Sequence, residues 1–108
     1  MSFRREIEER QDKGPVIKLF GELDIYTSTD FKDEVLEILE KYKDNIYLDL
    51  KDLEYIDSTG LGSLIALVKT AKEIDKKVYL KDVNERIRKL FKITALEDMF
   101  IFVGGIND

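Results

Sequence analysis

Residues 45–64 read NIYLDLKDLEYIDSTGLGSL, and the spacing of the apolar side chains changes within this stretch. Residues 45–50 predict a short strand. From Leu61 onward, a helical stripe ending near Lys76 and Lys77 predicts a helix. The stripe runs through Leu64, Ile65, Val68, Ala71 and Lys72. A strand, a polar loop and a helix in direct succession are the repeating unit of an α/β domain.

The flanking sequence continues the alternation of strands and helices. Before this unit we expect an edge strand within 3–10, a turn at 12–14, a strand at 16–23 that forms a hairpin with the first, and an amphipathic helix over roughly 28–43 with a capping arrangement of Thr27 and Asp30. After it we expect a strand at 78–80, a helix capped by Asn84, and a strand at 99–103 ended by Gly104 and Gly105. Residues 1–108 therefore predict one α/β domain with a mixed, mainly parallel sheet of four to five strands and right-handed βα crossover helices.

The composition narrows the classes of function that the chain can have. The 18 basic and 23 acidic residues give a net charge of −5 and are interspersed, which argues against a nucleic-acid surface. Neither an apolar leader nor 18 consecutive apolar residues occur, so we expect a cytoplasmic protein without membrane contact. Because histidine and cysteine are both absent, a Ser-His-Asp triad, a Cys-His pair and the usual zinc sites are excluded. We expect neither a metal nor a cofactor.

Three catalytic or nucleotide-binding interpretations of DSTGLG at 57–62 are weakly supported. Gly60 and Gly62 supply two glycines of a GxGxxG loop, but Ile65 stands in the third position. Ser58 lacks the preceding glycine of a hydrolase elbow, where Ile56 stands, and has no histidine base. A receiver-type phosphoacceptor at Asp49 or Asp52 would need a pair of acids after the first buried strand, where only Asp24 occurs.

The simplest interpretation of Ser58 and Thr59 is helix capping, because both residue types favour the N-cap position. Capping does not exclude modification. The free N–H groups and the positive dipole end of a helix N-terminus also accommodate phosphate. A hydroxyl at this point is therefore one whose phosphorylation the fold would tolerate.

Three landmarks together resemble the STAS domains of bacterial anti-sigma factor antagonists. They are DSTGLG at 57–62, FGELDIYTSTDF at 20–31 and NERIRKLFKITALEDMFIFV at 84–103, in the family's order and over nearly the whole chain. The resemblance implies that an anti-sigma factor with serine kinase activity phosphorylates the motif serine. It also implies that only the unphosphorylated form binds that factor and frees the sigma factor, and that a metal-dependent serine phosphatase resets the switch.

Carried over to this chain, the resemblance makes Ser58 the phosphoacceptor and Thr59 a secondary acceptor. The implied partner-binding residues are Asp24, Asp57, Ser58, Thr59, Gly60, Leu61 and Gly62. The protein would then be the substrate of this chemistry and not an enzyme. The alternative is a STAS scaffold, or a component of a larger signalling or transport complex, without a phospho-switch.

Two features depart from the family pattern. Ser63 stands where an apolar residue is expected, which places a further hydroxyl near the motif. Family members usually continue into a terminal helix, whereas this sequence ends at Asp108, soon after the last expected strand. We therefore expect one sheet face to be less covered and to leave an apolar patch.

Overall fold

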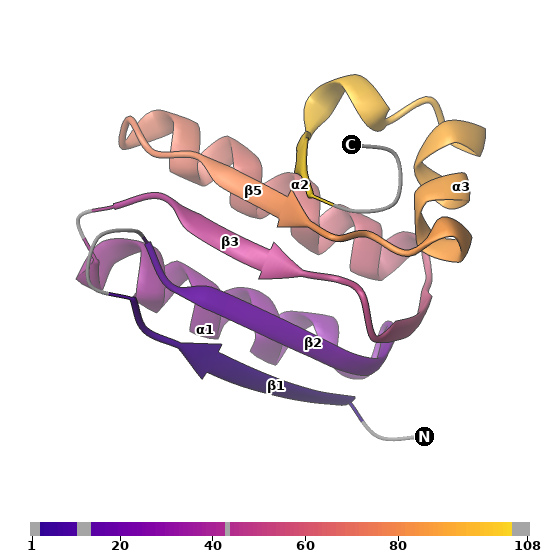
Figure 1. The fold of residues 1–108 in the computed structure, drawn as a ribbon, viewed down its shortest axis with the longest axis horizontal. Helices are drawn as coiled ribbons and strands as arrows, with labels where there is room; N and C mark the ends of the chain where they lie inside the picture. The colour runs from indigo at the N-terminus through magenta and orange to yellow at the C-terminus, as the bar shows by residue number, and fades with distance from the viewer. Residues whose placement is uncertain (1–2, 11–13, 43, 105–108) are drawn as a thin grey trace.

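The computed structural model describes residues 3–10, 14–42 and 44–104, which form a mixed sheet and three α-helices (Figure 1). The strands are β1 (Phe3–Glu8), β2 (Val16–Leu23), β3 (Ile46–Asp49), β4 (Leu53–Ile56), β5 (Val78–Lys81) and β6 (Ile101–Val103). The helices are α1 (Ser28–Lys41), α2 (Ser58–Glu73), α3 (Glu85–Ile93) and the short 3-10 helix η1 (Glu97–Met99).

The sheet has the strand order β1-β2-β3-β5-β6, and β4 pairs with the far end of β2. β1 and β2 form the expected antiparallel hairpin, whereas the pairs β2–β3, β2–β4, β3–β5 and β5–β6 are all parallel. This confirms the mainly parallel α/β sheet. The carboxyl ends of β2 and β4 lie side by side, because Leu23 pairs with Ile56. The loops that follow these two strands therefore meet at one edge of the sheet.

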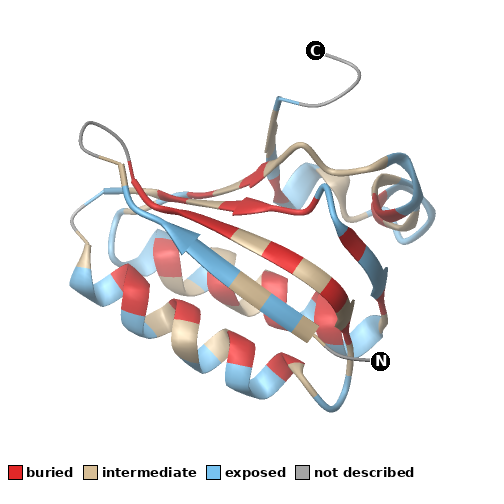
Figure 2. Cartoon of the chain, turned by 60° about the horizontal axis from the view of Figure 1, so that its bottom comes forward, coloured by how far each residue is buried: buried red, intermediate tan, exposed pale blue. Residues whose placement is uncertain are grey.

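The hydrophobic core lies between the sheet and the two helices α1 and α2, which cover one sheet face (Figures 1 and 2). The sequence dictates this arrangement, because apolar residues alternate along the strand and recur every three or four positions along the helix. In β2, alternate residues such as Ile17, Leu19 and Leu23 are fully buried, and in α1 the buried residues recur every three or four positions, as at Phe31, Val35 and Ile38. The side chain of Arg5 on β1 is bonded to Glu34 on α1, which holds the edge strand to this layer.

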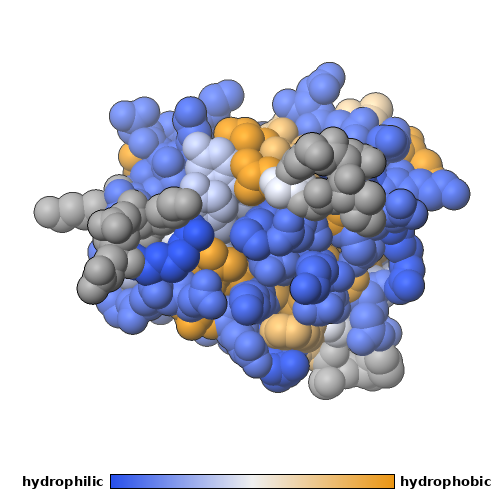
Figure 3. Space-filling model, in the orientation of Figure 1, coloured by the Kyte–Doolittle hydropathy of each residue, from blue (hydrophilic) through white to orange (hydrophobic). Residues whose placement is uncertain are grey.

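The opposite sheet face carries no helix layer among the described residues, and it does not form the apolar patch that the sequence predicts. In Figure 3 hydrophilic side chains dominate this face and the apolar areas are small and separate. Arg4 lies 4.0 Å above the ring of Phe20, and Arg10 lies 4.6 Å from the ring of Tyr47, which stacks on Tyr79. Basic side chains thus cover part of the aromatic surface.

Several element boundaries differ from the sequence prediction. A sixth strand, β4, occupies Leu53–Ile56, where no strand was expected. Its buried residues are three apart because a register shift between Gly21 and Glu22 accommodates one extra residue, so the alternation typical of a strand is lost. The first strand ends at Glu8, α2 starts three residues earlier than predicted and ends at Glu73, and η1 delays the last strand to Ile101. The predicted turn residues 12 and 13, position 43 and Gly105 lie outside the described residues.

Two features of the described residues bear on function. None of their helices combines the length and the apolar character that crossing a membrane requires. In the same ranges, no three acidic side chains come together as a metal-binding group.

Candidate functional site

The first turn of α2 is capped by Asp57, not by Ser58 or Thr59, so the predicted capping by these two residues is wrong. Asp57 has an extended backbone, and its Oδ1 accepts a hydrogen bond of 2.9 Å from the Gly60 N–H. An aspartate caps as well as a serine and adds a negative charge at the positive end of the helix. Ser58 is then the first helical residue, and its exposed hydroxyl makes no hydrogen bond to any described residue.

Asp57 also joins the start of α2 to the loop between β2 and α1. Its Oδ2 accepts a hydrogen bond of 3.2 Å from the N–H of Ile25, and its own N–H donates to the Leu23 carbonyl over 3.3 Å. The motif Asp57-Ser58 and the segment 24–27 therefore form one surface, although more than thirty residues separate them in the sequence.

The loop before α1 is organised by Asp24 and Thr27. Asp24 Oδ1 accepts hydrogen bonds from the Tyr26 N–H at 2.9 Å and from the Thr27 hydroxyl at 3.2 Å. Thr27 occupies the N-cap position of α1, but its hydroxyl oxygen makes no capping bond and instead accepts from the Asp24 N–H. The capping arrangement predicted for Thr27 and Asp30 is therefore absent, and Asp24 shapes the loop.

The two motif glycines have different roles. A Cβ added at Gly60 would lie 2.4 Å from the Leu23 carbonyl oxygen and 2.7 Å from Cγ1 of Ile56. A side chain at Gly62 would meet nothing within 4 Å. Gly60 therefore allows α2 to start close against β2, and Gly60 and Leu61 are buried, whereas Thr59 and Gly62 are exposed.

The sequence reading missed the two most prominent side chains of this surface. Ile25 is 63% exposed and Tyr26 is 89% exposed, in the loop that Asp57 holds beside Ser58. Large apolar side chains on a monomer surface are common singly, but two adjacent ones beside an exposed serine suit a protein contact. The only sequence signal is their position between turn-forming residues, in DIYTST at 24–29.

Ser63, the hydroxyl that departs from the family pattern, is enclosed. It is only 6% exposed, and its hydroxyl donates to the Gly60 carbonyl over 2.6 Å. The position thus faces inward, as the expected apolar residue would. On this surface the side chains of Ser58 and Thr59 are exposed, whereas the hydroxyl of Ser63 is bonded inside the helix.

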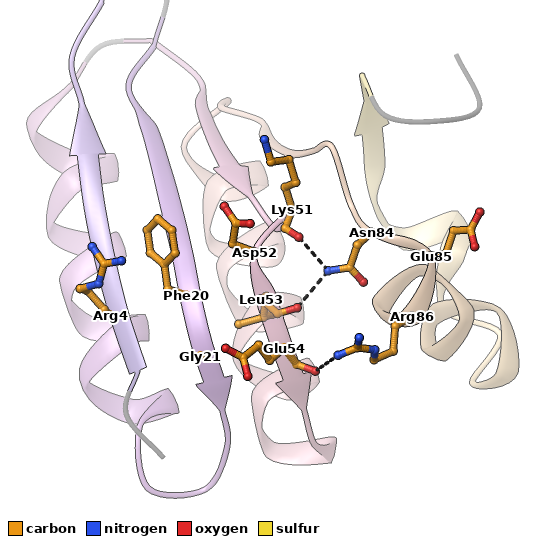
Figure 4. A pocket seen from close by; sticks show the side chains of 10 residues that line it. All are labelled: Arg4, Phe20, Gly21, Lys51, Asp52, Leu53, Glu54, Asn84, Glu85 and Arg86. Carbon is orange, nitrogen blue, oxygen red and sulfur yellow. Dashed lines mark hydrogen bonds between the residues drawn. The ribbon is translucent and has the colours of Figure 1, made fainter.

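A hollow of about 1100 Å³ lies away from this surface (Figure 4). It is a wide depression between β2, β4 and the start of α3, and none of the predicted site residues lines it. The Asn84 amide donates to the carbonyls of Leu50, Lys51 and Leu53, and its oxygen accepts from the Ile87 N–H. Asn84 is therefore the helix cap that the sequence predicts, and it also anchors α3 to the turn before β4.

Comparisons with known proteins point to one family. The STAS domain model matches residues 4–107. The anti-sigma-B factor antagonist of Staphylococcus aureus strain NCTC 8325 / PS 47 is 37% identical over 89 residues, which are 82% of each chain. Its counterpart from Staphylococcus epidermidis is 35% identical over 83 residues, 77% of each chain.

Solved structures agree on the fold. An anti-sigma factor antagonist from Mycobacterium paratuberculosis superimposes with a TM-score of 0.76 at 22% identity, covering 94% of this chain and 85% of its own. The Bacillus cell fate determinant SpoIIAA in its phosphorylated form superimposes with a TM-score of 0.72 at 19% identity, covering 96% and 93%.

Proposed function

The chain belongs to the STAS domain family, and we propose that it is an anti-sigma factor antagonist whose partner binding is switched off by phosphorylation of Ser58. In this proposal residues 1–108 act as one domain. The observation that carries it is the placement of Ser58. Its hydroxyl is exposed and unbonded among the described residues, at the first position of a helix that Asp57 already caps.

Ser58 suits reversible phosphorylation because the fold does not depend on its hydroxyl. Phosphorylation adds roughly −1.5 to −2 charges at neutral pH, and the positive end of α2 accommodates them. The nearby Asp57 is already occupied by the N–H groups of Gly60 and Ile25. We therefore expect the phosphorylated chain to keep its fold and to change mainly its surface charge.

The partner-binding surface in this proposal is Asp24, Asp57, Ser58, Thr59 and Gly62 together with Ile25 and Tyr26, which bury against the anti-sigma factor. A phosphate at its centre then faces a desolvated contact. Like-charge or unpaired-charge contacts can cost several kcal/mol, and a cost of about 3 kcal/mol weakens binding roughly a hundredfold. Such a change is large enough to release a partner.

The enzymes in this proposal are other proteins. The anti-sigma factor is the serine kinase, a metal-dependent phosphatase restores Ser58, and this chain acts in the cytoplasm as substrate and binder without catalysis of its own. The support is the 37% identity to the anti-sigma-B factor antagonist of Staphylococcus aureus and the absence of histidine and cysteine from the chain.

The test is phosphorylation by an anti-sigma factor kinase encoded in the same genome, with ATP and Mg²⁺, followed by mass spectrometry and a pull-down. We expect phosphate on Ser58 and no bound partner after phosphorylation. Ser58→Ala should abolish phosphorylation and keep binding, and Ser58→Asp should weaken binding.

Ser63→Ala is the matched control, because it removes a nearby hydroxyl that is buried, and it should leave phosphorylation of Ser58 unchanged. Phosphate at another residue, with Ser58 unmodified, would rule out the assignment. Equal binding before and after stoichiometric phosphorylation would favour a STAS scaffold without a switch.

A further inference from the structure

A small hollow lies between the first turns of α1 and α2, next to the surface described above. Its volume is about 200 Å³, and it is lined by Ser28, Thr29, Lys32, Thr59, Gly62, Ser63 and Ala66. Ser58 does not line it. Ser28 and Thr29 lie four and three residues before Lys32 on α1, and Thr59, Gly62, Ser63 and Ala66 lie within two turns of α2, so each helix presents one face to the hollow. Gly62 and Ala66 are small, which leaves the space open.

Ser28 is a buried polar residue without a visible purpose in the fold. It is only 2% exposed, yet its hydroxyl makes no hydrogen bond to any described residue. No fully buried side-chain oxygen or nitrogen of the described residues lacks a partner, so the exposed remainder of Ser28 includes its hydroxyl oxygen. This oxygen therefore opens into the hollow that Ser28 lines. A hydroxyl that is accessible and has no protein partner is free to bond a water or a small ligand in the hollow.

Among the other polar groups of the lining, the Ser63 hydroxyl is bonded to the Gly60 carbonyl and the remaining groups make no hydrogen bond to a described residue. Lys32 makes no ion pair or hydrogen bond with a described residue, and the hydroxyls of Thr29 and Thr59 make none. Lys32 carries the only charge of the lining, and no carboxylate lines the hollow. The hollow thus offers one cation and three free hydroxyl donors, at the N-terminal ends of two helices, whose dipoles favour an anion.

We propose that this hollow binds a small oxyanion of the phosphate class, held by the Lys32 ammonium and the hydroxyls of Ser28, Thr29 and Thr59. The volume limits the ligand, because pockets for drug-sized molecules span about 300 to 1,000 Å³. A phosphate or sulfate fits about 200 Å³, whereas a whole nucleotide does not. The site is distinct from the Ser58 hydroxyl and does not require that Ser58 be modified.

The test is a titration of the unphosphorylated full chain with inorganic phosphate, in which amide chemical shifts are monitored by NMR. Sodium chloride keeps the ionic strength constant at neutral pH. We expect saturable shifts at Ser28, Thr29, Thr59 and Gly62. Lys32→Gln should lower the apparent affinity roughly tenfold, because a charge-assisted hydrogen bond is lost. Ser28→Ala should lower it roughly fivefold and leave the fold intact, because this hydroxyl supports no other residue.

Lys89→Gln is the matched control, since Lys89 is exposed on α3 and its loss changes the net charge equally. It should leave the affinity unchanged. Shifts that do not saturate, that chloride reproduces, or that Lys32→Gln leaves unaltered would overturn the site.

A second arm distinguishes a free anion from a phosphoryl group carried by the chain itself, and this arm alone rests on the proposed function. The titration is repeated on chain phosphorylated at Ser58. Loss of free-phosphate binding supports the attached phosphoryl group as the occupant, and retained binding supports a free anion. Both results keep the oxyanion site, whereas failure of Ser58 phosphorylation would count only against the proposed switch.

Discussion

The carboxylate of Asp57 accepts the backbone N–H of Ile25 over 3.2 Å through one oxygen and the N–H of Gly60 over 2.9 Å through the other. One side chain therefore sets both halves of the proposed partner surface. Its first bond orders the loop that presents Tyr26, and its second starts the helix that presents Ser58. The loop and the helix start are thus coupled through a single residue.

Replacing Asp57 should affect stability and surface geometry together. We expect Asp57→Ala to lower the free energy of unfolding by about 2 kcal/mol, because a good N-cap is lost together with the bond to Ile25. Asp57→Asn retains a capping oxygen but presents only one, so its cost should be smaller. Urea denaturation measures both changes, and amide exchange at Ile25 reports the loop. Equal stability of Asp57→Ala and the parent chain would contradict the capping role.

The two motif glycines provide a matched pair of substitutions. Gly60→Ala should lower the free energy of unfolding by about 2 to 3 kcal/mol, because its Cβ would lie 2.4 Å from the Leu23 carbonyl oxygen. Gly62→Ala places its Cβ in open space, so it should raise stability by up to about 1 kcal/mol through helix propensity. Thermal unfolding of the two variants separates steric need from a general preference for glycine. Similar effects at both positions would contradict this interpretation.

The regular elements of the fold could be predicted because their periods are clear. The stripe of α1, the buried strand β2 and the Asn84 cap all follow from residue spacing. β4 could not be predicted, because its buried residues Leu53 and Ile56 are three apart, and the extra residue that causes this, Glu54, lies opposite the step from Gly21 to Glu22 on β2. A bulge of one residue breaks the alternation by which a strand is recognised in a sequence.

At the candidate site, the sequence could not show which residue caps α2, because several adjacent residues favour the N-cap position equally. Asp57, Ser58 and Thr59 are all good N-cap residues, and only the extended backbone of Asp57 shows which one caps. The exposure of Tyr26 was equally hidden, since an aromatic residue in the sequence usually indicates burial. It follows from the loop, in which Asp57 accepts the Ile25 N–H and Asp24 accepts the Tyr26 N–H.

Ile25 and Tyr26 should matter for binding and not for folding. Tyr26→Ala and Ile25→Ala should change the free energy of unfolding by less than about 0.5 kcal/mol, because both side chains are exposed. If they bury against the anti-sigma factor, each should weaken binding by about tenfold to a hundredfold, as central aromatic and aliphatic contacts do. Calorimetric titration with that factor measures the effect.

Ile93→Ala is the control for these two variants, because Ile93 is 69% exposed on α3, outside the proposed surface. It should bind like the parent chain. If Ile93→Ala weakens binding and Tyr26→Ala does not, the contact surface lies elsewhere on the molecule.

Variants of Asn84 distinguish its role as a helix cap from its role in anchoring α3. Its oxygen accepts the Ile87 N–H at 3.0 Å. Its two amide N–H groups are shared among three carbonyl oxygens, those of Leu50, Lys51 and Leu53, and Figure 4 shows the bonds to Lys51 and Leu53. Asn84→Ala should lower the free energy of unfolding by about 2 kcal/mol, because the cap and these donations are lost.

Asn84→Asp is the sharper test, because aspartate is as good an N-cap as asparagine on propensity alone. A carboxylate cannot donate, and here it would face three carbonyl oxygens that the amide now satisfies. We therefore expect Asn84→Asp to be no more stable than Asn84→Ala at neutral pH. Acidification should narrow its deficit relative to the parent chain, since a protonated carboxyl group can donate one hydrogen bond. Urea denaturation at neutral and acidic pH measures this, and parent-like stability of Asn84→Asp at neutral pH would show that capping alone accounts for Asn84.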